Sequence, residues 1–335
     1  MEKNCVFLPQ PIEEHALQVL KKEQVEILQA PDTGPHTISS LMKKADAVVL
    51  RTGVSITSQV LENAPRLLTV SRTGAGVDNV DLEAATKKGV IVTSSVGVNT
   101  VPVVEHTMAV MMCLFKQLFM MDRELRKGNF RVRYQNYPRN INKKTLGVVG
   151  FGKIGSLLGE RCSHMGMKVL AYDPYIKKQQ AEKYKQRVEF VDLKQLFKNA
   201  DVVSIHIPLT ENTRGLINME VLKLMKQSAF LLNTSRGGII NEEDLAKALQ
   251  EGVLAGAGLD VFENEPPGPQ SPLLKLDNIV LTPHSAALTA ECVVDMATSA
   301  VRRVLDVLHG YLPDNIANPE VLRSDKWRNL KKKTG

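Results

Sequence analysis

Short apolar runs alternate with polar segments along the first hundred residues. Runs of this length, bounded by turn residues, predict buried β-strands. The predicted strands are Cys5–Leu8, Val25–Leu28, Ala47–Leu50, Leu67–Ser71 and Val90–Val92. Between them, apolar residues with helical spacing predict helices over Ile12–Lys22 and Ile38–Lys44. This alternation favours a parallel sheet with helices on both faces.

A second series of the same kind runs from Leu146 to about His284. Its predicted strands are Leu146–Val149, Lys168–Tyr172, Ala229–Asn233, Gly256–Leu259 and Asn278–Leu281, and the helix after the first strand is Ser156–Met165. Before this series, Val103–Lys127 has the pattern of one long helix that is apolar on several faces, which predicts burial in a core or an interface. After it, Ala290–Leu308 is predicted to be an amphipathic helix.

The order of these elements predicts a chain that leaves one domain and returns to it. We expect two doubly wound parallel-sheet α/β domains, one from residues 1–100 and 288–335 and the other from residues 101–287. The chain would cross near Asn99–Val103 and Pro283–Leu288. We expect a cleft between the domains to hold a small substrate against a bound cofactor.

The composition is that of a globular protein. Of the 335 residues, 43% are hydrophobic and 24% are charged. We find no apolar run of about 18 residues and no apolar core at the N-terminus, so we expect neither a membrane span nor a secretory signal. Cys5, Cys113, Cys162 and Cys292 lack metal-ligand spacing, which predicts free thiols, no metal and a cytoplasmic location.

The net charge of +7 raises the possibility of a nucleic-acid partner. Part of the excess lies in the basic tail at residues 326–333, and the rest is spread thinly without interleaved aromatic residues. We therefore expect no nucleic-acid partner. Attraction of anionic substrates and cofactor is an alternative use of the charge.

The most specific motif is Thr-Leu-Gly-Val-Val-Gly-Phe-Gly-Lys-Ile-Gly at residues 145–155. Gly150, Gly152 and Gly155 fall in the G-x-G-x-x-G register between a predicted strand and a predicted helix. In dinucleotide-binding folds these glycines permit a tight turn, approach of the pyrophosphate and close helix–strand packing. The helix N-terminus favours the anion. A glycine-rich turn without a ligand would explain the glycines, but not the acid that follows.

That acid is Asp173, which ends the second strand of this series, 18 residues past Gly155. An acid near this spacing binds the adenosine ribose in dinucleotide sites. Its charge also repels a 2′-phosphate, so we expect NAD rather than NADP. Lys177 and Lys178 are close enough in sequence to keep NADP as an alternative.

Polar residues also follow the last three predicted strands, at Arg236, Asp260, Glu265 and His284. Ligands of open α/β sheets bind outside the carboxyl ends of the strands. This set suits hydride exchange between a nicotinamide and a 2-hydroxy or 2-keto acid. Arg236 would hold the substrate carboxylate, His284 would exchange the proton, and Glu265 would orient His284. Asp260 would hold the nicotinamide carboxamide.

Each side chain also has a simpler explanation when it is considered alone. Arg236 would be a surface residue of a glycine-rich loop, His284 a hydrogen-bonded loop histidine, and Glu265 a solvated turn residue. Their shared position after successive strands argues against three coincidences. His206, after another strand, is expected to line the nicotinamide pocket rather than to titrate in catalysis.

The chain closely resembles the D-isomer-specific 2-hydroxyacid dehydrogenases over roughly residues 4–320. The resemblance rests on Ser-Arg-Thr-Gly-Ala-Gly-Val-Asp-Asn-Val at 71–80, the glycine motif at 147–155, Asn-Thr-Ser-Arg-Gly at 233–237, Gly-Leu-Asp-Val-Phe-Glu-Asn-Glu-Pro at 258–266 and Thr-Pro-His-Ser-Ala at 282–286. It implies a flavodoxin-like substrate domain from both chain ends and a Rossmann coenzyme domain between them. It also implies a homodimer joined through the coenzyme domain, for which the apolar helix Val103–Met121 would suit the interface.

The resemblance further implies Arg236, Glu265 and His284 as the catalytic set, and backbone N–H groups of Gly74–Val77 as ligands of the substrate carboxylate. With the motifs above, the predicted cofactor-binding residues are Gly150, Gly152, Lys153, Ile154, Gly155, Asp173, His206, Ile207, Pro208, Thr213, Thr234, Ser235, Arg236, Asp260, His284 and Ala286. The predicted substrate-binding residues are Arg51, Arg72, Gly74, Ala75, Gly76, Val77, Arg236 and His284.

Within the family, the chain looks most like phosphoglycerate dehydrogenases. Arg51 and Arg72 match positions at which those enzymes contact the substrate phosphate, and guanidinium groups suit a phosphate. Arg131 and Arg133 would add to the positive electrostatic field around that phosphate. We therefore expect D-3-phosphoglycerate or 3-phosphohydroxypyruvate as the substrate, which would make this an enzyme of serine biosynthesis. A surface or domain-interface ion pair is the simpler explanation of Arg51 and Arg72.

Two features favour a different substrate. His-Ser-Ala-Ala-Leu-Thr at 284–289 departs from the His-x-Gly-Gly/Ala pattern of phosphoglycerate dehydrogenases and resembles hydroxypyruvate and glyoxylate reductases. The chain also ends near residue 335 without the regulatory domain that some phosphoglycerate dehydrogenases carry. A function of another class is an NAD-sensing binding protein, like the transcriptional corepressors built on this fold.

Overall fold

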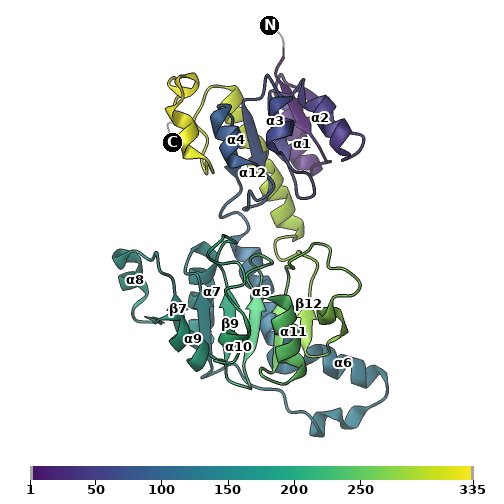
Figure 1. The fold of residues 1–335 in the computed structure, drawn as a ribbon, viewed down its shortest axis with the longest axis vertical. Coiled ribbons are helices and arrows are strands. Elements are labelled where there is room, and N and C mark those ends of the chain that lie inside the picture. Colours follow the sequence, from purple (N-terminus) through teal and green to yellow (C-terminus); the bar gives the residue numbers. More distant parts are fainter. Residues whose placement is uncertain (1–2, 333–335) are drawn as a thin grey trace. The chain divides into compact units, whose positions relative to one another are not determined.

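The computed structural model describes residues 3–332 and divides the chain into two compact units (Figure 1). The first unit is Met1–Asn99 with Leu288–Gly335, and the second is Thr100–Ala287. Each unit contains one sheet, of five and seven strands, and all the recorded pairs of named strands are parallel. The predicted fold class, two parallel-sheet α/β domains, is confirmed.

The sheet of the first unit has the strand order β2-β1-β3-β4-β5, which is that of flavodoxin-like folds. Its strands are β1 (Cys5–Leu8), β2 (Glu26–Gln29), β3 (Ala47–Leu50), β4 (Thr69–Arg72) and β5 (Ile91–Ser94). Its helices are α1 (Glu14–Lys22), α2 (Pro35–Met42), α3 (Ser58–Glu62), α4 (Leu82–Lys87) and α12 (Ala290–Leu308), with the 3₁₀ turns η3 (Pro319–Arg323) and η4 (Asp325–Trp327).

Alternate residues of the first sheet feed two cores. Val6 and Leu8 pack with α1 and α12 on one face, whereas Phe7 packs with α2, α3 and α4 on the other. α12 is long because it crosses three strands, β3, β4 and β5. Burial on both faces explains why the strands are continuous apolar runs rather than alternating ones.

The second unit has the strand order β12-β11-β10-β9-β6-β7-β8. Its strands are β6 (Thr145–Val149), β7 (Lys168–Tyr172), β8 (Val188–Phe190), β9 (Val202–Ile205), β10 (Phe230–Asn233), β11 (Gly256–Leu259) and β12 (Ile279–Leu281). Its helices are α5 (Thr100–Lys116), α6 (Leu118–Arg126), α7 (Lys153–His164), α8 (Lys178–Tyr184), α9 (Leu193–Asn199), α10 (Met219–Leu222) and α11 (Glu242–Gln250), with η1 (Phe130–Tyr134) and η2 (Pro272–Lys275).

The strand order of the second unit reverses between β6 and β9. From β6 the chain builds β7 and β8 on one side, and then returns to build β9 to β12 on the other (Figure 1). Ligands of doubly wound sheets bind at this switch point, outside the carboxyl ends of the strands. The turn after β6 is the glycine motif, and the turn after β9 begins at His206.

Helices cover both faces of the second sheet. α5 and α7 pack on one face, with Leu146 and Val148 of β6, and α9, α10 and α11 pack on the other. Most predicted strands agree with the structure to within two residues at each end. α7 begins at Lys153, three residues before the predicted start, so the third glycine of the motif lies inside the helix.

The predicted single helix Val103–Lys127 is wrong, because two helices cover this range. Gln117 adopts a left-handed conformation (φ +52°), and α5 and α6 meet there at 57°. α5 buries one face against β10, β11, β12 and α7. No glycine or proline marks the break, so nothing local in the sequence indicated it.

Among the described residues, no single helix is long and apolar enough to cross a membrane. The bent pair α5–α6 passes that test of length and composition only when the two helices are taken together.

Candidate active site

The glycine motif forms a tight turn between β6 and α7. Gly150 has φ +92°, and a β-carbon there would lie 2.5 Å from the carbonyl oxygen of His206. A β-carbon on Gly155 would lie 2.0 Å from the carbonyl oxygen of Gly150. No atom lies within 4 Å of a β-carbon built on Gly152. The first and third glycines are therefore required by packing, while the second leaves its backbone open, as a pyrophosphate needs.

Asp173 lies directly after β7, beside this turn. Its carboxylate accepts hydrogen bonds from the backbone N–H groups of Phe151 and Tyr175, both at 2.9 Å. The contact with Phe151 fixes the central residue of the glycine turn. Each carboxylate oxygen keeps a further lone pair, so these bonds leave room for ribose hydroxyls.

The loop after β9 begins with His206, Ile207 and Pro208. Ser204 Oγ lies 2.8 Å from His206 Nε2, and the Thr213 hydroxyl donates to the carbonyl of Pro208 at 2.8 Å. Although His206 keeps some exposed surface, desolvation of its ring lowers its pKa to about 4. A ring that is neutral near pH 7 supports the interpretation that His206 lines a pocket and does not titrate in turnover.

His284 and Glu265 form an acid–base pair at this edge of the sheet. His284 Nδ1 lies 2.7 Å from Glu265 Oε2, and Glu265 Oε1 accepts from the backbone N–H of Phe262 at 3.1 Å. A carboxylate only accepts, so Nδ1 carries a hydrogen and Nε2 remains for a further partner. The imidazole side chain is 44% exposed, which leaves it accessible to a small molecule.

Arg236 lies in the loop after β10, the strand next to β11. The buried side chain of Asn233 shapes this loop, because its amide donates to the carbonyl of Arg236 at 2.8 Å and accepts from Ser235 N at 3.0 Å. The Arg236 guanidinium donates to the carbonyl of Ser235 at 2.7 Å. The loop therefore presents a half-buried guanidinium at the carboxyl edge.

Asp260 is buried beneath the segment that carries His284, and its contact with the nicotinamide carboxamide stays a prediction. Its side chain is 1% exposed and accepts from Ser285 N at 2.8 Å and from Ala286 N at 2.9 Å. The Thr282 hydroxyl lies 2.6 Å from the same carboxylate. These contacts favour Asp260 as the support of the segment that carries His284.

Comparison with known proteins identifies the family of this chain. Residues 108–286 match the NAD-binding domain of the D-isomer specific 2-hydroxyacid dehydrogenases, as the family's description reads. A glyoxylate reductase of Korarchaeum cryptofilum is 38% identical over 96% of this chain and 98% of its own length. The chain belongs to the D-isomer specific 2-hydroxyacid dehydrogenase family.

Other relatives and solved structures also match over nearly the whole chain. A D-3-phosphoglycerate dehydrogenase of Methanocaldococcus jannaschii is 38% identical over 97% of this chain, which spans only 62% of that relative. Among solved structures, the TT0316 protein of Thermus thermophilus matches with a TM-score of 0.86 and 32% identity over 93% of this chain and 99% of its own. A D-lactate dehydrogenase of Aquifex aeolicus, complexed with NAD and lactic acid, matches with a TM-score of 0.82 and 30% identity over 96% and 98%.

Membership of this dehydrogenase family accounts for the glycine turn and Asp173. The matched range runs from the middle of α5 to the segment after β12 and so contains all seven strands of this sheet. NAD is therefore the cofactor of this domain, and the open backbone at Gly152 fits its pyrophosphate.

The first unit carries the arginines predicted to bind a phosphate. Arg51, after β3, donates from Nη1 to Glu13 Oε1 at 2.9 Å and to the carbonyl of Pro11 at 3.1 Å. Arg72, at the end of β4, donates to Asn79 Oδ1 at 2.9 Å. Both arginines lie at the carboxyl edge of this sheet, and both are already paired within their own unit. Gly74–Val77 follow Arg72, whose guanidinium would lie 3.0 Å from a β-carbon on Gly74.

Arg131 and Arg133 do not join the carboxyl edge of either sheet. They lie in η1, which packs on α6, at the amino edge of the second sheet. The path of the chain explains this position. α5 begins near the carboxyl edge and runs the length of the sheet, and Phe115 in its last turn packs on Phe230 at the start of β10. The expected contribution of these arginines to a substrate phosphate field is therefore a wrong prediction.

Sequence reasoning missed two residues of α5 that contact the active-site loops. His106 Nε2 lies 3.0 Å from Thr282 Oγ1, and Thr107 Oγ1 lies 2.9 Å from Thr234 Oγ1. The sequence signal for them was the polar triplet Glu105-His106-Thr107 inside a run that is otherwise apolar from Val103 to Phe115. Only the packing of α5 on β10 and β12 brings these side chains to the loops.

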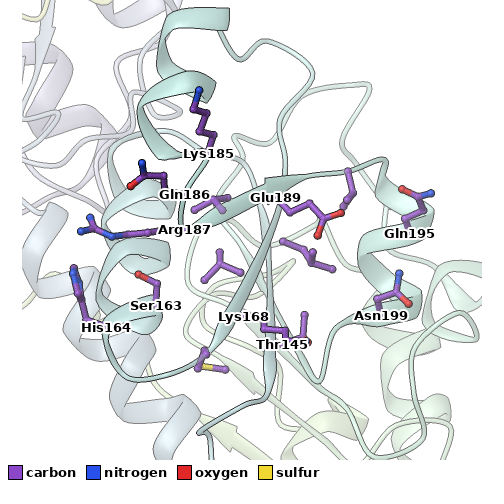
Figure 2. Close-up of a pocket in the computed structure, with 15 residues that line it drawn as sticks. Thr145, Ser163, His164, Lys168, Lys185, Gln186, Arg187, Glu189, Gln195 and Asn199 are labelled. Atoms are coloured by element: carbon purple, nitrogen blue, oxygen red, sulfur yellow. The ribbon is translucent and has the colours of Figure 1, made fainter.

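A cavity of about 780 Å³ lies away from these loops, at the amino ends of β6, β7 and β8 (Figure 2). Figure 2 shows Arg187, His164 and Ser163 on one side of it and Gln195 and Asn199 on the other. Its position at the opposite edge of the sheet separates it from the glycine turn. Within residues 3–332, no cluster of three or more potential ligands is arranged to hold a metal ion.

Proposed function

We propose that this protein is an NAD-dependent dehydrogenase that exchanges a hydride between its cofactor and a small D-2-hydroxy acid or the matching 2-keto acid. The observation that carries the proposal is the 2.7 Å contact between His284 Nδ1 and Glu265 Oε2. This pair stands on the same sheet edge as the glycine turn and as Arg236. The family supports the reaction class, and the catalytic roles are our assignment.

When bound, NADH supplies the hydride that reduces the keto carbon. His284 Nε2 donates its proton to the carbonyl oxygen, which becomes the hydroxyl group. Glu265 accepts Nδ1–H throughout, which orients the ring and stabilises the imidazolium before the transfer. Arg236 binds the substrate carboxylate through its planar guanidinium. In the reverse direction, His284 accepts the hydroxyl proton.

The proposed substrate is D-3-phosphoglycerate or its keto acid, 3-phosphohydroxypyruvate. Arg51 and Arg72 at one sheet edge support this choice, as do the phosphoglycerate dehydrogenases among the relatives. A glyoxylate or hydroxypyruvate reductase is the second candidate. The ion pair between Arg51 and Glu13 favours this second candidate, because Glu13 neutralises one of the two arginines that would bind a phosphate. The glyoxylate reductases also match this chain over nearly their full length.

The test is a set of initial rates of NADH oxidation with glyoxylate, hydroxypyruvate, pyruvate and 3-phosphohydroxypyruvate, repeated with NADPH. We expect the highest kcat/KM with the phosphorylated acid, and a preference for an unphosphorylated acid would assign the second candidate instead. Turnover far below about 1 per second with all four acids would sink the dehydrogenase proposal and favour an NAD-sensing binding protein. His284→Ala should lower kcat by about a hundredfold or more while NADH still binds.

The proposed roles of the two units follow from this reaction. Thr100–Ala287 is the coenzyme domain, and the unit formed by both chain ends, with Gly74–Val77, is the substrate domain. Asp173 is proposed to make NAD the preferred cofactor, because its carboxylate would repel the 2′-phosphate of NADP.

A homodimer through the coenzyme domain is also proposed, and the end of the predicted helix range Val103–Met121 supplies part of its surface. Most of that range is α5, whose apolar side chains are largely buried in the unit. The last residues of the range lie on α6, where Leu118 and Phe119 are exposed, and Phe130 of the neighbouring η1 is exposed as well. An exposed apolar cluster of this kind is typical of a protein–protein interface.

A further inference from the structure

His284 has an unusual backbone conformation. Its φ of +51° lies in the left-handed region, which residues other than glycine rarely adopt. Its backbone N–H donates to the carbonyl of Asp260 at 2.8 Å and to that of Thr282 at 3.1 Å. The imidazole reaches Glu265 from this conformation, so the surrounding contacts must hold the segment after β12 in place.

The Asp260 carboxylate is the centre of those contacts. It is buried and accepts from the two backbone N–H groups that follow His284, those of Ser285 and Ala286. It also accepts from the Thr282 hydroxyl at 2.6 Å. One carboxylate therefore binds the chain on both sides of His284.

His106 of α5 completes this network from outside the loop. Its Nε2 lies 3.0 Å from Thr282 Oγ1 and 3.7 Å from Asp260 Oδ1. The hydroxyl of Thr282 has one hydrogen, and a carboxylate can only accept, so that hydrogen points to Asp260. Toward His106, Thr282 can then only accept. The geometry therefore requires a hydrogen on Nε2 of His106.

The next residue of the same helix contacts the other catalytic loop. Thr107 Oγ1 lies 2.9 Å from Thr234 Oγ1, and Thr234 precedes Arg236 by two residues. Both threonines are buried. Consecutive side chains of one helix thus bind the loop of Arg236 and the loop of His284.

We infer that His106 is a positioning residue, which donates its Nε2–H to Thr282 and thereby holds the Asp260–Thr282 network that sets the conformation of His284. It acts through Thr282 and does not touch the reacting atoms. The inference rests on the proposed function, because His284 is the proton donor there. Thr282 is the acceptor that links α5 to the catalytic segment, and Asp260 accepts the hydrogen of the Thr282 hydroxyl.

Three variants test this role. His106→Leu keeps the size of the side chain but removes the donor, whereas His106→Gln can still supply an N–H at a similar reach. Glu105→Gln is the matched control, because Glu105 lies on the same helix and pairs with Arg161 at 3.3 Å. We expect His106→Leu to lower kcat about tenfold with little change in the KM for NADH, since a small displacement of a catalytic group has large effects on rate. His106→Gln should stay within about threefold of the wild type.

Nuclear magnetic resonance of ¹⁵N-labelled histidine rings gives a second readout that needs no turnover. The wild type should show His106 protonated at Nε2, and the ring signals of His284 should shift in His106→Leu but not in Glu105→Gln. An unprotonated Nε2, equal kcat in His106→Leu and the wild type, or equal losses in the Leu and Gln variants would each overturn the inference. Absent turnover in the wild type together with the expected ring signals would reject the proposed function and leave the positioning role intact.

Discussion

Several charged side chains at the carboxyl edges of the two sheets are held by neighbours within the same unit. Asp173 fixes the glycine turn through Phe151, Glu265 holds the His284 ring, and Arg51 pairs with Glu13. Such contacts reduce the number of conformations that each group must give up when a ligand binds. A charged partner also changes the net charge that the side chain presents to a ligand. The function of a residue therefore depends on its partner as much as on its type.

The Glu13–Arg51 pair gives a prediction about substrate charge. Glu13→Gln removes the carboxylate that neutralises Arg51, so the variant should favour a substrate with an additional phosphate charge more strongly than the wild type does. We expect the ratio of kcat/KM for 3-phosphohydroxypyruvate to that for glyoxylate to rise several-fold, or about 1 kcal/mol in transition-state binding. Glu14→Gln is the control, because this neighbouring acid contacts Gln18 rather than Arg51. An unchanged ratio would show that Arg51 does not contact the substrate.

His206 predicts a pH dependence of stability. Its pKa falls from an ordinary value of 6.5 to about 4 through desolvation, so the unfolded chain binds a proton in this window that the folded chain does not. The free energy of unfolding should therefore decrease as the pH falls from about 6.5 towards 4. Urea unfolding at about pH 7 and pH 5 should reveal a loss that is about 1 kcal/mol larger in the wild type than in His206→Asn. Parallel losses in both proteins would contradict this assignment.

At the scale of elements, the loops after β10 and β11 are joined by direct backbone contact. A β-carbon on Gly237 would lie 1.7 Å from the carbonyl oxygen of Phe262. Gly237 follows Arg236, and Phe262 lies three residues before Glu265, so this contact ties the guanidinium loop to the carboxylate loop. Because Gly237 has no side chain, the two loops can approach closely, and this approach fixes the position of Arg236 relative to Glu265.

Gly237→Ala should separate these two loops. Because the added methyl meets backbone rather than a flexible side chain, we expect a loss of stability of about 3 kcal/mol or more, together with a lower kcat. Gly268→Ala is the control, since nothing lies within 4 Å of a β-carbon there. Thermal denaturation and initial rates measure both effects. A variant with wild-type melting temperature and kcat would contradict the packing argument.

At the scale of the whole molecule, both units present their chemistry at the carboxyl ends of parallel strands. In the first unit these are Arg51 and Arg72, and in the second the glycine turn, Glu265 and His284. Parallel strands joined by right-handed crossovers bring the loops that follow them to one edge, even when they lie far apart in sequence. The amino edge of the second sheet carries a different surface, formed by α6 and η1.

That surface gives a prediction about assembly. If α6 and η1 form a dimer interface, Phe119→Asp combined with Phe130→Asp should bury two charges in it and shift the protein from dimer to monomer. Phe119 is 63% exposed and Phe130 is 60% exposed in the single chain. Light scattering after size exclusion measures the mass. Tyr175→Asp, at an exposed position of the same unit, should leave the dimer intact, and a wild-type mass for the double variant would exclude this surface.

The sequence by itself determined the class of the fold, the glycine turn and the acid after β7. Buried parallel strands must be short apolar runs, and a dinucleotide turn admits only glycine at its tight positions, so both leave local patterns. It also indicated which strand ends carry polar side chains. The break at Gln117 and the pairing of Arg51 with Glu13 left no such pattern.

Only the tertiary structure decided those features, because each depends on residues far apart in the chain. Asp260 was predicted from its place after β11 alone, and only the structure shows that its carboxylate accepts from backbone donors of the segment after β12. Nothing in the sequence around His106 indicated its contact with Thr282, which the packing of α5 creates. The local sequence pattern indicates the backbone conformation and burial of a segment. The contacts of each side chain depend on how the helices and strands pack against one another.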